Sequence, residues 1–111
     1  MTLNSKTDCI SSLNACLSRT ADWRRGLQAK FPGDARNGKA AAKLELMASQ
    51  AYDLSDDAWA ELQPHFNWCS GTWSDSVSQV SRLVEFRNVN SFATFVKVLA
   101  RILSEKAEIA A

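Results

Sequence analysis

The sequence predicts an all-α protein, a compact bundle of about five helices with the C-terminal helix at its centre. Apolar residues recur at spacings of three and four along most of the chain, which is the period of an amphipathic helix. Residues that cap or stop helices separate these periodic stretches. With 111 residues, 46% of them apolar and 23% charged, residues 1–111 should form one domain with its own core.

The first helix is expected over residues 6–30, because Pro32 disfavours helical geometry in the residue before it. Its expected buried seam consists of Cys9, Leu13, Cys16, Thr20, Trp23 and Leu27, and Ile10 and Leu17 widen this stripe. Asp34 can act as the N-cap of a second helix, although Asn37 and Gly38 can delay its start, and the alanine-rich segment continues through Asp53. Its expected inward face consists of Ala40, Leu44, Met47, Ala51 and Leu54.

The third helix has the clearest start signal in the chain. Ser55 is expected as its N-cap, and Asp56 and Asp57 lie in the first turn, where the helix dipole favours acidic side chains. Leu54 is placed to contact Trp59 as a hydrophobic staple. The helix should therefore begin directly after Ser55.

Two further helices are expected in the C-terminal third. Thr72 and Asp75 have the spacing of a capping box, which predicts a helix over residues 74–87. Asn90 or Ser91 can cap the last helix. That helix is the most apolar of the five, which is typical of a central bundle helix. Its apolar residues are Phe92, Phe95, Val96, Val98, Leu99, Ile102 and Leu103.

Residues 54–66, LSDDAWAELQPHF, resemble the short opening segment of some insertion-sequence transposases, which has a similar pattern of Leu, Ser or Thr, Asp, Trp, Leu and Pro. The resemblance covers 13 of 111 residues, and the chain has no room for the acidic-triad catalytic domain of those enzymes. Shared helix-start chemistry accounts for the pattern. No activity is therefore carried over to this chain.

Charge is sorted along the chain. Residues 1–43 carry a balance of +5, residues 44–76 contain six acids and no Lys or Arg, and residues 77–111 carry +2. The total of +1 therefore conceals opposed local charges, which affect association more than folding. We expect basic and acidic side chains to occupy different sides of the bundle.

The basic segment allows a nucleic-acid interpretation. Its cations could follow a phosphate backbone, with Trp23 as a stacking surface, if the first two helices pack as an antiparallel pair. The candidate residues are Arg19, Arg24, Arg25, Lys30, Arg36, Lys39 and Lys43. A solvated basic face is the simpler interpretation, because Trp23 continues the expected core seam and the net charge is small.

Aromatic residues gather around a polar loop over residues 67–73. Phe66, Trp68 and Trp73 either pack over the end of the bundle or form exposed anchors for a partner, since aromatic residues are enriched at binding hot spots. Together with Asp56 and Asp57, these three aromatics form the predicted protein-binding set. The leading hypothesis is thus a small non-enzymatic adaptor, accessory subunit or inhibitor that binds a protein partner or itself.

Enzyme and cofactor chemistry find little support in the residues. The glycines form neither a Walker loop nor a GxGxxG turn, and His65, Ser70 and Asp75 carry no cue that would align a triad. Cys9, Cys16 and Cys69 lack metal-ligand spacing and suit a reducing compartment. We therefore expect no catalytic residue, cofactor, metal or small-molecule substrate, no membrane association, and a cytoplasmic location.

Overall fold

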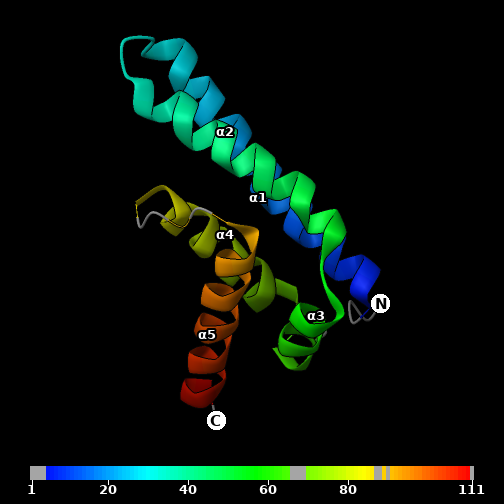
Figure 1. Cartoon of the computed structure of the whole chain (residues 1–111). Helices are drawn as coiled ribbons and strands as arrows, with labels where there is room; N and C mark the ends of the chain where they lie inside the picture. The colour runs from blue at the N-terminus through cyan, green and yellow to red at the C-terminus, as the bar shows by residue number, and fades with distance from the viewer. Residues whose placement is uncertain (1–4, 66–69, 87–88, 90, 111) are drawn as a thin grey trace.

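A long helical hairpin is the largest feature of the computed structural model, which describes residues 5–65, 70–86, 89 and 91–110 (Figure 1). Helices α1 (Lys6–Lys30) and α2 (Ala35–Gln50) pack side by side, and their connecting loop projects away from the other helices. The Asn14 side chain of α1 donates a hydrogen bond of 2.8 Å to the carbonyl oxygen of Ala48 in α2. This contact fixes the register of the hairpin.

The remaining helices form the second part of the bundle. Helix α4 packs against α1, and α5 packs against α4 and α3. In chain order the elements after α2 are η1 (Ala51–Asp53), α3 (Asp56–Leu62), η2 (Gln63–His65), α4 (Ser70–Phe86) and α5 (Phe92–Ala110). The all-α bundle of five α-helices is confirmed, and no strand occurs in the described ranges.

Local capping explains where three of the helices begin. The Asp34 carboxylate accepts a hydrogen bond from the backbone N–H of Arg36, and the Ser55 hydroxyl accepts one from Ala58 at 3.1 Å. The Ser91 hydroxyl likewise accepts a hydrogen bond from the backbone N–H of Thr94 at 3.2 Å. Each cap side chain accepts a hydrogen bond from a backbone N–H group of the first turn, which has no carbonyl partner within the helix. The three predicted N-caps are confirmed.

One core joins all five helices. Its largest fully buried side chains are Trp73, Phe95, Leu13, Leu17, Leu44, Met47, Leu62, Leu99, Val77 and Val80. Helix α5 contributes Phe95, Val96, Leu99 and Leu103, as its apolar sequence predicts. Its main contacts are with α3 and α4, however, so it lies on one side of the bundle, and α1 is the helix that links the hairpin to α4.

Two predicted boundaries differ from the structure. Helix α4 begins at Ser70, so Thr72 and Asp75 lie inside the helix and cannot form the expected capping box. Helix α2 ends at Gln50, and the chain tightens into the 3₁₀ turn η1 before the next cap. Tight turns of this kind are common at helix ends.

The buried face of α1 also differs from the predicted seam. Cys9, Leu13, Leu17 and Ala21 are buried at a constant spacing of four, whereas Trp23 is 53% exposed. Each step of four advances the buried stripe by about 40° around the helix, whereas the mixed steps of three and four in the predicted seam stay on one side. The buried stripe therefore drifts away from the predicted seam and leaves Trp23 outside it. The prediction that this ring is buried is therefore wrong.

Candidate functional site

The seven predicted phosphate-contacting cations do not form an uninterrupted basic face. Arg25 of α1 pairs with Glu45 of α2 at 2.6 Å, and Arg36 pairs with Asp34 at 2.8 Å. The Arg25 hydrogen bond lowers the pKa of the Glu45 carboxyl. Cations and acids are thus partly interleaved into local ion pairs along the hairpin, contrary to a complete segregation of charge.

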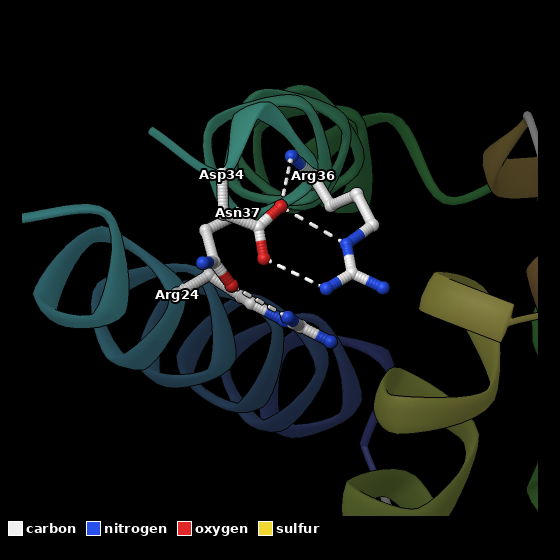
Figure 2. A network of polar contacts seen from close by, with 4 residues as sticks. All are labelled: Arg24, Asp34, Arg36 and Asn37. Atoms are coloured by element: carbon white, nitrogen blue, oxygen red, sulfur yellow. Dashed lines mark hydrogen bonds and ion pairs between the residues drawn. The ribbon is translucent and has the colours of Figure 1, made fainter. Parts of the chain in front are cut away.

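A partly buried polar contact joins the two helices near the hairpin loop. Figure 2 shows Arg24 of α1 and Asn37 of α2 with their side chains directed at one another. The Arg24 guanidinium donates a hydrogen bond of 2.7 Å to Asn37 Oδ1, and Asn37 is only 4% exposed. The Arg24 guanidinium carbon also lies 5.1 Å from the centroid of the Trp23 ring. Arg24 therefore has a structural role in addition to its charge.

The Asp34–Arg36 pair shown in the same view couples the start of α2 to pH. The side-chain and backbone hydrogen bonds from Arg36 lower the pKa of Asp34 from 3.8 to about 2. A carboxyl whose pKa is lower in the folded state stabilises the fold above its unfolded pKa, and this contribution disappears as the pH falls through the folded pKa. The relevant window is therefore pH 3.8 to about 2.

Replacing Asp34 with asparagine should make acid destabilisation shallower in this window. Asparagine is as good an N-cap as aspartate, so Asp34→Asn retains the cap and removes the charge. Thermal melts across the pH range, followed by circular dichroism, measure the effect. If the melting temperatures of the parent protein and of Asp34→Asn fall by the same amount between pH 3.8 and about 2, Asp34 makes no contribution to the acid destabilisation.

Acidic residues surround a groove between α3 and α5 of about 340 Å³. We call it the α3–α5 groove. Asp53, Asp57 and Glu61 line it, and all three are exposed and make no ion pair with any residue in the described part of the chain. Lys97 of α5 is the one cation among the described residues that line it. The groove therefore carries an excess of negative charge.

The interior of the α3–α5 groove is apolar. Phe92 and Val96 of α5 and Ala58 of α3 contribute to its lining. The Phe92 ring stacks on Phe95, with ring centroids 6.0 Å apart, and Phe95 is fully buried. Phe92 therefore joins the floor of the groove to the hydrophobic core. This floor is an apolar surface with carboxylates on its rim.

The predicted protein-binding residues fall in several places. Asp57 lines the groove, whereas Asp56 points to α1 and pairs with Lys6 at 2.8 Å. Trp73 is 2% exposed, because it lies within α4 rather than in a loop, so its ring belongs to the core and cannot be an exposed anchor. Phe66 and Trp68 lie outside the described residues.

Sequence reasoning missed most of the groove. Asp57 and Glu61 are separated by four residues on α3, a spacing that places them on one helix face and that could have been recognised. Phe92, Val96 and Lys97 belong to a helix that starts 30 residues beyond Leu62, and no local signal brings α5 against α3. Tertiary packing alone creates this site.

The described side chains show little that suggests metal or nucleophilic chemistry. No group of three His, Cys, Asp or Glu residues converges in the described ranges. Burial raises the pKa of the Cys9 thiol to about 12, which disfavours its reactive thiolate form. His65 Nε2 lies 3.2 Å from the Ser104 hydroxyl, at the surface of α5.

Comparisons with known proteins identify no relatives. No family model matches the chain, and neither a curated protein nor a solved structure resembles it significantly. Within the described residues, no helix has both the length and the apolar character that crossing a bilayer requires.

Proposed function

We propose that this chain is a small non-enzymatic interaction module that binds a protein partner through the α3–α5 groove. One observation carries this proposal: three carboxylates without ion-pair partners in the described part of the chain, on the rim of an apolar groove. Asp34 and Glu45, by contrast, are held in ion pairs with arginines. Unpaired charge around apolar surface suits recognition by a complementary segment.

The matching partner segment is basic and amphipathic. Apolar side chains would contact Phe92 and Val96, and lysine or arginine side chains would neutralise Asp57 and Glu61. A basic amphipathic helix lying in a groove is a recurrent form of such recognition. Complementary charge of this kind mainly accelerates association and sets specificity, while apolar contacts supply much of the affinity.

A second copy of the chain is one possible source of such a segment. Lys39 and Lys43 of α2 make no ion pair with any described residue. If they entered the groove of another copy, two different patches would meet, which gives a head-to-tail contact. We further propose a cytoplasmic setting, where the free thiols of Cys9 and Cys16 remain reduced.

Neutralising the groove should weaken the binding of a basic amphipathic peptide. We expect the double variant Asp57→Asn/Glu61→Gln to bind a fluorescent leucine–lysine helical peptide about three- to tenfold less tightly than the parent protein, since exposed ion pairs contribute modest energies. Fluorescence anisotropy at low and high salt measures this affinity. Binding by the parent protein should weaken as salt rises.

Asp22→Asn is the matched control, because Asp22 is an exposed acid on α1 that does not line the groove. It should bind the peptide as the parent does, and a leucine–glutamate peptide should not bind. Equal loss in the groove variant and the control would contradict the proposal. Light scattering on the same variants identifies self-association, which would appear as a low-salt increase in mass that the groove variant abolishes.

The alternative function, an accessory nucleic-acid-binding subunit, has a narrower basis. Two of its seven cations, Arg25 and Arg36, are held in ion pairs, and Arg24 is used in the hairpin contact with Asn37. The exposed ring of Trp23 is the observation that favours it. A long phosphate track over α1 and α2 is therefore less well supported than a local contact at Trp23.

A further inference from the structure

A pocket of about 260 Å³ lies between α1 and α4, on a different surface from the α3–α5 groove. We call it the α1–α4 pocket. Helix α1 contributes Arg19 and Trp23, and helix α4 contributes Ser78 and Arg82. Cys16, which also lines the pocket, approaches the buried Ser81 hydroxyl of α4 at 3.4 Å and so ties the two helices together below it.

The charged side chains known to line the α1–α4 pocket are both cations. Arg19 and Arg82 line it, and no Asp or Glu is among its lining residues in the described part of the chain. Neither guanidinium makes a hydrogen bond or ion pair with another residue in the part of the chain that the structure describes. Two arginines from different helices beside one pocket, without acids to neutralise them, form a receptor for an anion.

An aromatic surface adjoins these cations. Trp23 lines the pocket and remains 53% exposed, although an indole ring buries much apolar surface when it packs in a core. Trp73 and Val77 supply the apolar part of the lining from α4. A flat ring could therefore contact Trp23 while an attached anionic group reaches the arginines.

We infer that the α1–α4 pocket binds a nucleotide unit, a phosphate monoester attached to a flat base. In this arrangement Arg19 and Arg82 hold the phosphate, and the base stacks on Trp23. A phosphate monoester carries a charge of about −1.5 to −2 at neutral pH, which two guanidinium groups balance. A carboxylate would neutralise only one of them.

The hydroxyl groups of the pocket also suit phosphate. Ser12 and Ser78 line it, and hydroxyls together with two guanidinium groups supply more donors than the two oxygens of a carboxylate need. A phosphate monoester offers three acceptor oxygens. The volume of about 260 Å³ lies just below the range of about 300–1,000 Å³ that is typical of ligand pockets, so it accommodates one nucleotide rather than two.

This inference is independent of the proposed protein partner, because no described residue lines both cavities. The same phosphate monoester is available from a free nucleotide or from the 5′-phosphorylated end of a single strand.

Isothermal titration with adenosine 5′-monophosphate tests the pocket directly. We expect saturable binding, weaker binding of ribose 5-phosphate, which lacks the base, and weaker binding of adenosine, which lacks the phosphate. Affinity should also fall when the pH is lowered below about 6, because the phosphate then gains a proton. Equal affinity for ribose 5-phosphate and the nucleotide would overturn the stacking role of Trp23.

Two substitutions locate the binding. Arg19→Gln and Arg82→Gln should each weaken nucleotide binding about tenfold, as expected for the loss of a charged hydrogen-bond donor. Arg101→Gln is the matched control, because Arg101 is an exposed arginine on α5 that does not line the pocket. Circular dichroism melts establish that each variant is folded. Binding that is unaffected in both pocket variants, or equally reduced in the control, would overturn the inference.

A short single-stranded oligoadenylate with a 5′-phosphate distinguishes the two sources. If it binds and the free nucleotide does not, the ligand is a strand, and the pocket still requires Arg19 and Arg82. If the nucleotide binds as well as the strand does, the ligand is the free nucleotide. Failure of both ligands to bind overturns the inference, and leaves the peptide experiment on the α3–α5 groove unaffected.

Discussion

Replacing Trp73 with alanine is expected to lower the free energy of unfolding by about 3–5 kcal/mol, which is the usual cost of removing a large aromatic side chain from a core. Trp73 is 2% exposed and belongs to the main hydrophobic cluster. Small domains are stable by only about 5–15 kcal/mol, so the variant should be close to unfolding at room temperature. Urea denaturation followed by circular dichroism measures the change.

Trp23→Ala is the matched control, since it makes the same chemical change on the surface. Trp23 is 53% exposed and contacts Arg24, so we expect the free energy of unfolding to fall by only about 1 kcal/mol. The sequence predicts Trp23 in the core, and it leaves Trp73 open between packing over the end of the bundle and serving as an exposed anchor. Equal destabilisation by the two substitutions would contradict the assignment of these rings to core and surface.

The helix boundaries that sequence predicts well are those set by local chemistry. The predicted range 6–30 coincides with α1, and Asp34, Ser55 and Ser91 cap helices as expected. An N-cap acts within three residues of its own position, so its effect does not depend on the rest of the fold. Such signals can be recognised in a single sequence.

Side-chain burial is harder to predict, because it depends on which helices meet. Trp23 and Trp73 both fit an apolar stripe, and only the packing of α4 on α1 decides which ring is covered. The start of α4 at Ser70 also affects burial. It places Trp73, which the sequence assigns to a loop, inside a helix. Periodicity defines a helix face but not its neighbour.

The order of charged residues in the sequence predicts only part of the charge distribution on the folded surface. The pair between Lys6 and Asp56 joins residues 50 positions apart, and it removes Asp56 from the expected acidic patch. Asp57, its neighbour in sequence, lines the α3–α5 groove instead. One residue along a helix turns a side chain by about 100°, so adjacent acids can serve different surfaces.

The contact between Arg24 and Asn37 is expected to be the strongest polar coupling in the hairpin. Arg24 donates a hydrogen bond of 2.7 Å to an amide oxygen that is buried between α1 and α2. Hydrogen bonds to charged groups contribute about 1.5–3 kcal/mol, and a buried acceptor that loses its donor is costly. Arg24→Ala, Asn37→Ala and the double variant form a double-mutant cycle that isolates this energy.

Denaturant unfolding of the four proteins should give a coupling energy of about 1.5–3 kcal/mol. The pair between Arg25 and Glu45 provides the comparison, because it joins the same two helices with side chains that are 42% and 48% exposed. Water and salt screen such a pair, so its coupling should be smaller and should decrease further as salt is added. A coupling between Arg24 and Asn37 that is no larger, or equally sensitive to salt, would mean that burial of Asn37 adds nothing to the hairpin.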